Sequence, residues 1–490
     1  MIKNTQKFRV LSSKKQRKIE RNIRLLFPGQ VYDAMTDRFL KDSERSMEGY
    51  AIAECGLKAD PEKKNWTYMV KEVHIPERGQ LLEQSSVSVT PKAEFMEEIL
   101  SRAADRNSSV IELHTHVDSP SPNFSWKDID HGLDNGRFLK SCRIKFLMAV
   151  MGAEGFSLSE YDGDHDSLQV PEKAVISIMT RSGIKDMMTH KSNSSTEQIS
   201  PVFDRQLLIW GEGVQAQIQS MKIGIAGLGG TGSILLQMLA RMGVKKFVLC
   251  DHDIVEESNL SRLPYSFSPD IGKKKVKIAS NYLKKISKDI EVTAFPEKVQ
   301  QSKEEFKDCD VIFGCVDTEA ARLTLNEISL KYFIPYIDTG TEIFMDDKKM
   351  CDIGGQVRVV IPSVTGCLEC MGGIDKEMAA LESLDDESLR IRDSAGYVRG
   401  TDITPTPSVI TLNTIIASMA AQEFLNIAQG IEEPASAFNY LKYNAKSSDI
   451  ERLVFEKSES CPLCGSGGIL GSGDIKKQVK QKIKTINTKA

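Results

Sequence analysis

The apolar positions in the first part of the chain follow two different periods. Short apolar runs bounded by turn residues, such as "SMEGYAIAECG" and "SVIELHTH", predict buried strands. Phe95, Ile99 and Ala103 recur near helical spacing in "PKAEFMEEILSRAADRN" and predict a helix. "CRIKFLMAVMGAEGFSLSEYD" predicts a further hairpin of strands. We therefore expect an α+β domain in this part.

The second part of the chain alternates between strands and helices. "MKIGIAGLGGTGSILLQMLARMGVKKFVLCDHD" predicts a strand, a glycine turn, a helix and a second strand. "CDVIFGCVD" and "IPYIDTG" predict later strands, and the helix "TEAARLTLNEISLKY" separates them. This order predicts a Rossmann-like α/β domain with a doubly wound, mostly parallel sheet.

A polar segment between the two parts predicts how the chain divides into domains. "MTHKSNSSTEQISP" (188–201) is rich in Ser and Thr and lacks apolar periodicity, so it is expected to be a linker. Both ends of the chain are basic; such runs are usually solvated tails, and a docking role is the alternative. The expected parts are a basic segment 1–24, the α+β domain 25–185, a linker 186–201, the α/β domain 202–466 and a basic tail 467–490.

Charge and hydropathy exclude some classes of protein. A formal net charge of -4 over 490 residues argues against nucleic acid as the main partner. No apolar stretch approaches the ~18 residues that a membrane span needs, and no signal peptide is recognised before the first domain. We therefore expect a cytoplasmic protein without a membrane partner.

The turn after the first strand of the α/β domain predicts a phosphate-binding loop. Gly227, Gly229 and Gly232 form G-x-G-x-x-G, and Gly230 lies in the same turn. Glycines let the backbone approach a phosphate closely, and the N-terminus of the following helix then stabilises the negative charge. Alone, this motif would fit a dinucleotide-dependent dehydrogenase equally well.

Polar residues after the next strand favour a nucleoside triphosphate. They are Asp251, Asp253, Asn259, Arg262 and Lys275. A hydride-transferring enzyme does not need so many cations and amides here, whereas a site that stabilises charge developing at an α-phosphate does. Asp317, which closes the strand "VIFGCVD", could hold Mg²⁺ at the carboxyl edge of the sheet.

This part of the chain also resembles a known family. "DRQLLIWGEGVQAQIQSMKIGIAGLGGTGS", "DHDIVEESNLSR", "IGKKK" and "CVDTEAAR" resemble the ThiF/MoeB-like adenylating domain of ubiquitin-activating enzymes and of the adenylyltransferases of thiamine and molybdopterin synthesis. The resemblance covers about 203–466. It implies that ATP is bound by Asp251, Asn259, Arg262 and Lys275, with Asp317 on Mg²⁺. It also implies a homodimer, because Arg205 matches an arginine that family members supply from the other protomer.

Two Cys-x-x-Cys pairs predict a structural zinc site. The pairs are Cys367/Cys370 and Cys461/Cys464. Four thiolates in a tetrahedral array form a closed zinc site that joins distant segments and leaves no open position for chemistry. Ten cysteines in so long a chain do not make a disulfide framework. Free or redox-active thiols are the alternative.

The α+β domain carries candidate metal ligands of a different kind. His114 and His116 lie two residues apart on a predicted strand, so both point to the same face. Asp128 can complete the set from the loop that follows and leave a fourth position for water. Glu48, on the early strand, is the expected general base. Histidines that are simply buried in a core are the commoner explanation of such a pair.

The whole constellation resembles the zinc metalloprotease domain of the JAB/MPN (JAMM) type. A glutamate-bearing strand, "HTH", a Pro-rich loop and "SWKD" match its pattern over roughly 25–180. The resemblance implies that Ser125 helps to bind the oxyanion. It also implies that the enzyme cleaves after the C-terminal glycine of a ubiquitin-like protein.

This sequence departs from the JAB/MPN pattern at two positions. The spacer between His116 and Ser125 has eight residues, one more than is usual, and Val117 stands where proline is common. Both positions fall in a loop, which tolerates insertion. Glu44 and Glu54 flank Glu48 and leave the choice of the base open. A degenerate domain that only acts as a scaffold is the alternative.

Together the two domains predict a bifunctional enzyme. A protease that exposes a C-terminal glycine naturally precedes an enzyme that adenylates the glycine, with ATP, Mg²⁺ and zinc as cofactors. A conjugating enzyme is an expected further partner. One alternative is the activation of a sulfur-carrier protein for cofactor or amino-acid synthesis, with a sulfurtransferase as partner. The other is a non-catalytic scaffold that binds a ubiquitin-like protein.

The cysteine that forms a thioester in many ubiquitin-activating enzymes is missing from its usual place. The matching stretch "DSAGYVRGTDITPTPSVITLN" (393–413) contains no cysteine and has Thr401 near that position. A hydroxyl does not ionise appreciably near neutral pH and cannot replace a thiolate. We therefore expect the reaction to stop at the acyl-adenylate; a thioester on Cys351 or Cys315 is the alternative.

Overall fold

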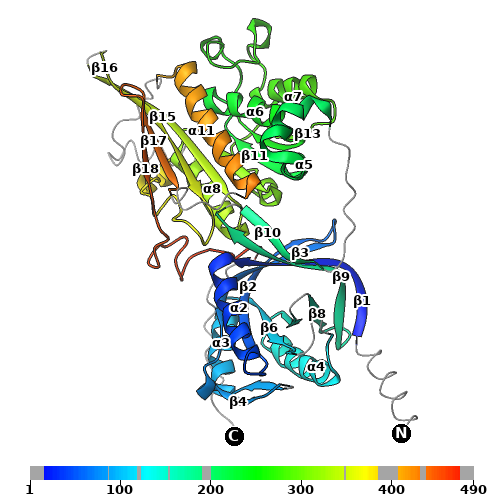
Figure 1. Cartoon of the computed structure of the whole chain (residues 1–490). Coiled ribbons are helices and arrows are strands. Elements are labelled where there is room, and N and C mark those ends of the chain that lie inside the picture. The colour runs from blue at the N-terminus through cyan, green and yellow to red at the C-terminus, as the bar shows by residue number, and fades with distance from the viewer. Residues whose placement is uncertain are drawn as a thin grey trace, which may run out of the picture. The chain divides into compact units, whose positions relative to one another are not determined.

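The structure is a computed structural model of the chain (Figure 1). It describes residues 16–86, 88–117, 123–152, 155–181, 183–189, 200–346, 349–384, 407–430 and 438–474. These residues form two compact units. Unit 1 takes the described residues within 1–178, 184–194 and 471–490, and unit 2 takes those within 179–183 and 195–470. Among the described helices, none combines the length and apolarity that a membrane crossing requires.

Unit 1 is built on one eight-stranded sheet. Its strands are β1 (Gln16–Pro28), β2 (Tyr50–Asp60), β3 (Asn65–His74), β6 (Ser109–Thr115), β7 (Phe146–Met151), β8 (Phe156–Asp162), β9 (Ser167–Thr180) and β10 (Gly183–Thr189). They follow the order β1-β3-β2-β6-β7-β8-β9-β10, and β1 also pairs with β9. The helices are α2 (Gly29–Ser43), α3 (Ala93–Asp105) and α4 (Trp126–Ser141), and β4 (Leu81–Gln84) pairs with β5 (Val89–Pro91) in a separate hairpin.

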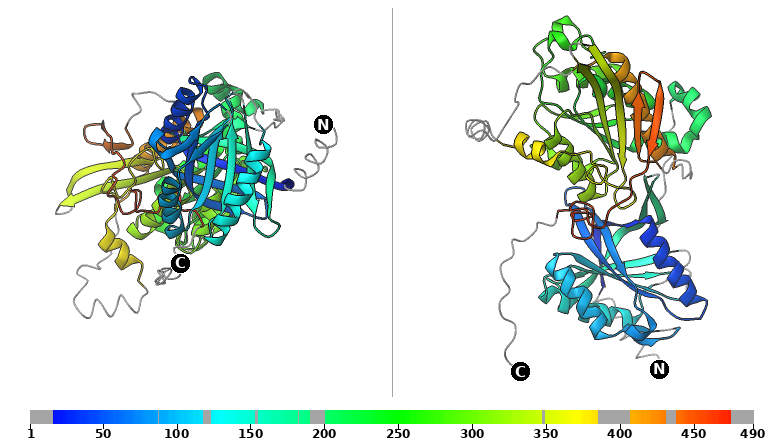
Figure 2. Two further views of the ribbon diagram at one scale, coloured as in Figure 1. Left: turned by 90° about the horizontal axis from the view of Figure 1, so that it is seen from below. Right: turned by 90° about the vertical axis from the view of Figure 1, so that its left-hand side faces the viewer.

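Period-two alternation along β6 decides which helix each side chain faces. Ile111 packs in the core that contains Met35 of α2, whereas Val110 packs in the core that contains Ile129 of α4. Helix α2 therefore covers one face of the sheet, and α3 and α4 cover the other, as the right-hand view of Figure 2 shows. His114 is in phase with Val110 and consequently faces α4.

Strand β1 lies largely inside the segment that was expected to be a basic tail. Ile23, Leu25 and Phe27 are buried in the sheet. Arg21 lies over the ring of Trp66, 4.1 Å from its centre. Basic residues are concentrated in the first half of this strand and buried apolar residues in the second half, so the charge bias concealed a partly buried strand. Strand β10 likewise runs into the segment that was expected to be a linker.

Unit 2 contains the predicted doubly wound sheet and an extension of it. The parallel strands are β11 (Lys222–Ala226), β12 (Lys246–Cys250), β13 (Glu291–Phe295), β14 (Val311–Gly314) and β15 (Tyr336–Asp346); β16 (Lys349–Val360), β17 (Tyr440–Asn444) and β18 (Asp449–Leu453) are antiparallel. The helices are α5 (Asp204–Ser220), α6 (Gly230–Met242), α7 (Lys275–Ile286), α8 (Glu319–Tyr332), α9 (Lys376–Glu382) and α11 (Ile410–Gln429).

The order of these strands places a binding edge at the glycine turn. The sheet runs β13-β12-β11-β14-β15-β16-β17-β18, so the chain reverses its direction of winding between β11 and β14. In open α/β sheets, ligands bind outside the carboxyl ends of the strands at such a switch point. The glycine turn follows β11 and Asp317 follows β14, which puts both at this edge.

The last described residues belong to unit 1, although the sequence assigned 467–490 to a tail. Only the first half of β2 pairs with β6, and residues 471–474 lie along its second half. The backbone N–H of Asp474 donates to the carbonyl of Leu57 at 2.8 Å, and the N–H of Ala59 donates to Asp474 Oδ2 at 3.1 Å. A Cβ on Gly56 would lie 1.7 Å from the carbonyl oxygen of Gly471, so glycine is required for this approach.

Candidate functional site

The structure brings the three predicted metal ligands of unit 1 together. His114 and His116 stand at the end of β6, and Asp128 lies in the first turn of α4. Nε2 of His114 lies 3.3 Å from Asp128 Oδ1, and Nε2 of His116 lies 3.4 Å from Asp128 Oδ2. One ligand atom of each residue falls within 4.8 Å of the other two. Three converging N and O atoms are a donor set that zinc accepts.

The chemistry of these side chains fits a metal ion. His114 is buried, and its Nε2 faces Asp128 at 3.3 Å without forming a hydrogen bond to any described residue. A buried polar atom normally forms a hydrogen bond, so a close contact without one needs an explanation. Burial would raise the pKa of Asp128, but contacts with the His114 and His116 imidazoles outweigh it and hold the pKa well below its usual range. Zinc requires an ionised carboxylate and a free imidazole lone pair.

Ser125 explains why α4 begins where it does. Its Oγ accepts a hydrogen bond from the N–H of Asp128 at 3.2 Å, and its own N–H donates to Asp128 Oδ2 at 2.6 Å. This reciprocal pair is a capping box, which satisfies two backbone donors at the helix N-terminus. It also orients the carboxylate of Asp128 toward the histidines. The serine therefore has a structural role in addition to any role in oxyanion binding.

Glu48 lies beside the metal-ligand set and is held through its backbone. Its N–H donates to the carbonyl of Ser85 at 2.8 Å, and its carbonyl accepts from Gln84 Nε2 at 2.9 Å. Burial raises the pKa of the Glu48 carboxyl, and the neighbouring His114 and His116 oppose the rise. A carboxyl with a raised pKa next to a candidate metal site is suited to general acid–base chemistry.

The other two glutamates lie elsewhere. Glu54 is completely buried near the middle of β2, where it accepts hydrogen bonds from Arg102 at 2.9 Å and Arg106 at 3.4 Å. Glu44 is exposed at the C-terminus of α2. Of the three glutamates, Glu48 is therefore the one that the structure places beside the histidines.

The glycine turn of unit 2 is packed against the ends of the central strands. Gly227 has a φ of 86°, and a Cβ on it would lie 2.2 Å from the carbonyl oxygen of Cys315. A Cβ on Gly229 would meet nothing within 4 Å, so the outer side of the turn is open. The carboxylate of Asp251 accepts from the N–H of Leu228 at 2.6 Å and from the N–H of Asp253 at 2.8 Å. Asp251 thus ties the turn to the end of β12.

The predicted phosphate-binding cations lie around this turn. Arg262 donates to the carbonyl of Ser258 at 2.7 Å, and its Cδ lies 3.4 Å from the place of a Cβ on Gly230. Nζ of Lys275 lies 2.7 Å from Asp253 Oδ2. Asn259 is buried nearby in a short 3₁₀ turn, Glu257–Asn259. Asp317 is exposed at the end of β14, and Arg205 is exposed on α5.

The four cysteines of the two Cys-x-x-Cys pairs converge. Sγ of Cys367 lies 3.7 Å from Sγ of Cys461 and 4.0 Å from Sγ of Cys370, and Sγ of Cys370 lies 3.4 Å from Sγ of Cys464. Four sulfurs about 2.3 Å from a tetrahedral zinc ion would lie roughly 3.8 Å apart. The hydrogen bond with Cys464 lowers the pKa of Cys367 to about 5, which favours the thiolate that zinc binds. The set fits structural zinc.

Part of the proposed acyl-transfer path is outside the described residues. Thr401 and most of the stretch 393–413 fall there, and the side chain of Cys351 does too. Cys315 is described, and burial raises the pKa of its thiol to about 12. A thiol with so high a pKa is a poor nucleophile near neutral pH.

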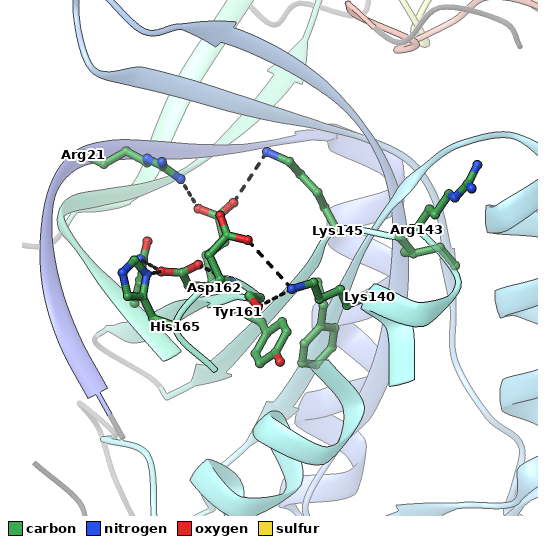
Figure 3. A pocket seen from close by; sticks show the side chains of 13 residues that line it. Arg21, Lys140, Arg143, Lys145, Tyr161, Asp162 and His165 are labelled. Carbon is green, nitrogen blue, oxygen red and sulfur yellow. Dashed lines mark hydrogen bonds and ion pairs between the residues drawn. The ribbon is translucent and has the colours of Figure 1, made fainter. Parts of the chain in front are cut away.

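A separate pocket of about 490 Å³ in unit 1 does not add a site (Figure 3). Its cations face its own carboxylates: Arg21 and Lys145 contact Glu160, and Lys140 contacts Asp164. It opens at the start of β7, whereas His114 is in register with Val150 near the end of that strand. The pocket is therefore remote from the metal ligands, and its charges largely compensate one another.

Some residues that support the candidate metal ligands were not predicted from the sequence. Thr115 and Gln84 position the backbone of Gly49 and Glu48, and Glu112 pairs with His131 on α4. Glu112 could have been found, since it precedes His114 by two residues and so shares its face of the strand. Nothing in the sequence marks Thr115 or Gln84.

Comparison with known proteins identifies unit 2. Residues 203–463, more than half of the chain, match the ThiF family. The chain belongs to the ThiF family. The prediction of a ThiF/MoeB-like adenylating fold for this part is therefore confirmed.

Several relatives of this ThiF protein are named as activating enzymes. It is 32% identical to SUMO-activating enzyme subunit 2 of Dictyostelium discoideum over 33% of the chain and 23% of that protein. It is 24% identical to ubiquitin-like modifier-activating enzyme 5 of Drosophila ananassae (50% of the chain, 59% of that protein). It is also 24% identical to SAMP-activating enzyme E1 of Haloferax volcanii (53% and 86%). The chain thus spans 23% and 59% of the first two relatives.

Among solved structures, the chain is similar to E. coli MccB crystallised with ATP. The identity is 20%, the likeness covers 55% of this chain and 75% of that chain, and the TM-score is 0.42.

Proposed function

We propose that the chain is a bifunctional enzyme of a ubiquitin-like protein. Unit 1 would be a zinc-dependent (iso)peptidase of the JAB/MPN type that cleaves after the C-terminal glycine, and unit 2 would adenylate the glycine carboxylate with ATP. One observation carries the proposal: His114, His116 and Asp128 converge beside Glu48 in a chain whose other unit is a ThiF domain. The names of the relatives support a ubiquitin-like substrate.

In the hydrolytic half, each residue has a role that its surroundings support. His114, His116 and Asp128 would hold zinc, which when bound supplies a Lewis acid for the scissile carbonyl and for water. Glu48 takes a proton from the attacking water and returns it to the departing amine. Its raised pKa, caused by burial, favours uptake of the proton from water. Ser125 Oγ, at the N-terminus of α4, can donate a hydrogen bond to the developing oxyanion.

In the adenylating half, the glycine turn and the N-terminus of α6 receive the phosphates of ATP. Arg262 and Lys275 stabilise the charge that develops on the α-phosphate, and Asp317 would hold Mg²⁺, which neutralises phosphate charge when bound. The glycine carboxylate attacks the α-phosphorus, an acyl-adenylate forms, and pyrophosphate leaves. Lys275 is paired with Asp253 at 2.7 Å, so ATP competes for this cation.

Exposed apolar residues around Arg205 support a homodimer. Val202, Leu208 and Ile209 have exposed fractions of 78%, 79% and 74%. So much exposed apolar surface on one short segment is typical of an interaction site. Arg205 would then reach the nucleotide of the second protomer. A conjugating enzyme or a sulfurtransferase stays a predicted further partner, and the cytoplasmic location stays a prediction.

The test begins with capture of the substrate. The full chain, incubated with MgATP in an extract of its source cells, should retain a small ubiquitin-like protein that mass spectrometry identifies. The glycine-ended form of that protein should support ATP–pyrophosphate exchange, and a tail-extended form should be trimmed to the glycine. Retention of no such protein, or neither reaction with the retained one, would contradict the proposal.

A further inference from the structure

A second set of polar contacts joins β6 to α4 next to the metal ligands. Glu112 precedes His114 by two residues on β6, and His131 and Asn135 follow Asp128 by three and seven residues on α4. Nε2 of His131 lies 3.0 Å from Glu112 Oε1, and Asn135 Nδ2 donates to Glu112 Oε2 at 2.9 Å. We name Glu112, His131 and Asn135 the carboxylate rung.

The carboxylate rung and the candidate metal ligands occupy neighbouring positions along the same strand and the same helix. Residues two apart on a strand share a face, and residues three, four and seven apart on a helix share a stripe. His114 meets Asp128 near the start of α4, and Glu112 meets His131 farther along it. Helix α4 therefore runs antiparallel to β6, with both polar stripes facing each other. Ile129 and Leu133 supply the apolar contacts of the same helix.

The buried carboxylate of Glu112 depends on its contacts with His131 and Asn135. Glu112 is only 3% exposed, and a buried carboxylate destabilises a fold unless it is paired and hydrogen-bonded. Apolar packing of Ile129 and Leu133 is non-directional, so by itself it permits small shifts of α4 along the sheet. The two hydrogen bonds of the carboxylate rung are directional and do not permit them.

We infer that Glu112, His131 and Asn135 are positioning residues of the metal site. They fix α4 against β6 so that the carboxylate of Asp128 meets His114 and His116 at metal-binding distances. Asp128 reaches the site from a different element than the histidines, so its position depends on the register of the helix on the sheet. The inference rests on the proposed zinc-dependent function of unit 1. Its direct consequence is that removal of these side chains lowers the affinity of the site for zinc.

The experiment measures zinc affinity in the full chain by competition with a chelator. The metal content is counted per chain, and the His114→Ala variant defines the zinc that remains on the four cysteines. We expect His131→Ala to weaken the unit 1 site about 10- to 100-fold, as loss of groups that orient metal ligands typically does. His131→Gln retains an N–H donor at nearly the same place and should recover most of this loss.

Arg137→Ala is the matched control on the same helix. Arg137 pairs with Asp166 at 2.9 Å, and both side chains are half exposed and outside the carboxylate rung. Its removal should leave zinc affinity unchanged. Thermal unfolding is followed in each variant, and Asn135→Ala, which removes one hydrogen bond, replaces His131→Ala if that variant does not fold. Asn135→Ala should show a smaller loss of zinc affinity.

The outcomes separate the inference from the proposed function. Wild-type zinc affinity in folded His131→Ala and Asn135→Ala overturns the inference and leaves the metal site standing. An equal loss of zinc affinity in Arg137→Ala overturns the inference too, because any disturbance of α4 would then be enough to weaken the site. A wild-type chain that holds zinc only on its cysteines overturns the proposed hydrolytic function and the inference with it.

Discussion

Thr115 and Gly49 exchange two hydrogen bonds and so fix the candidate base beside the candidate metal ligands. The N–H of Thr115 donates to the carbonyl of Gly49 at 3.1 Å, and Thr115 Oγ1 accepts from the N–H of Gly49 at 2.8 Å. Thr115 lies between His114 and His116, and Gly49 follows Glu48. The glycine is required, since a Cβ there would lie 2.4 Å from the ring of Phe39.

Glu48→Gln should abolish cleavage and spare zinc. The substitution keeps the size of the side chain and removes only the proton acceptor, so we expect a loss of roughly 10²- to 10⁴-fold in the cleavage rate. Zinc content is measured on the same sample. Glu44→Gln is the matched control, because Glu44 is exposed just after α2, and it should cleave at the wild-type rate. Loss of zinc together with activity would instead make Glu48 a ligand or a folding residue.

Glu54→Gln should change stability rather than catalysis. Burial would raise the pKa of Glu54, but hydrogen bonds from His74 and Arg102 outweigh it, and the folded pKa lies below its usual value. A carboxyl of this kind stabilises the fold above its unfolded pKa of about 4.3, and the contribution is lost as pH falls through the folded pKa. The free energy of unfolding of wild type should therefore exceed that of Glu54→Gln most near neutral pH, and the difference should shrink in acid.

Denaturant unfolding at several pH values checks this expectation. The difference in the free energy of unfolding between wild type and Glu54→Gln should be constant above about pH 5 and shrink below it. Cleavage by Glu54→Gln at neutral pH should stay near the wild-type rate. A difference that grows in acid, or a variant that is stable and inactive, would refute this assignment.

Arg262→Ala and Lys275→Ala should each abolish ATP–pyrophosphate exchange and spare proteolysis. Each removes a cation beside the glycine turn, and loss of one such group typically costs about 10²- to 10³-fold in rate. Lys277→Ala is the control, because Lys277 is exposed on the same helix as Lys275. Full exchange in Arg262→Ala would remove that residue from the proposed nucleotide site.

Arg205→Ala should also lose exchange if Arg205 acts across a dimer. Mixing Arg205→Ala with Asp317→Ala would then create one intact site per mixed dimer, so some activity should return on mixing. The rescue is measured as pyrophosphate exchange against each variant alone. If mixing restores nothing, Arg205 acts within its own chain or does not act on the nucleotide.

Gly56→Ala should destabilise unit 1 through the chain's last described segment. The added Cβ would collide with the carbonyl of Gly471, so residues 471–474 must leave β2 or β2 must shift. We expect a loss of about 1–3 kcal/mol in the free energy of unfolding. Gly79→Ala is the control, since a Cβ there would meet nothing within 4 Å. Equal stability of the two variants would mean that the segment contributes nothing to unit 1.

Local patterns predicted the parts of the fold that repeat a simple period. The strand–turn–helix around Gly227 and the strand that carries His114 follow from apolar spacing alone. The packing of Gly471 on Gly56 could not be predicted, because it joins residues more than 400 positions apart without a periodic signal. The antiparallel strands β16 to β18 were missed because the parallel βαβ pattern stops at β15.

In the candidate site, too, some residues could be predicted from the sequence and others could not. Types and spacing of the ligands indicated His114, His116 and Asp128, since metal ligands are few and chemically distinctive. The choice between Glu48 and Glu54 needed the structure. Glu48 shortly precedes β2 and Glu54 lies on it, so the sequence does not separate them, and only their neighbours in the structure differ. His131 and Asn135 became visible only when α4 was placed against β6.

The most direct test of the account compares ATP–pyrophosphate exchange on two forms of the captured ubiquitin-like protein. One form ends in its glycine, and the other carries a short C-terminal extension. Wild type should exchange with both, after a lag with the extended form, because trimming must come first. His114→Ala should exchange normally with the glycine-ended form and not at all with the extended form. Full exchange by His114→Ala on the extended form, or none by wild type on either, would contradict the account.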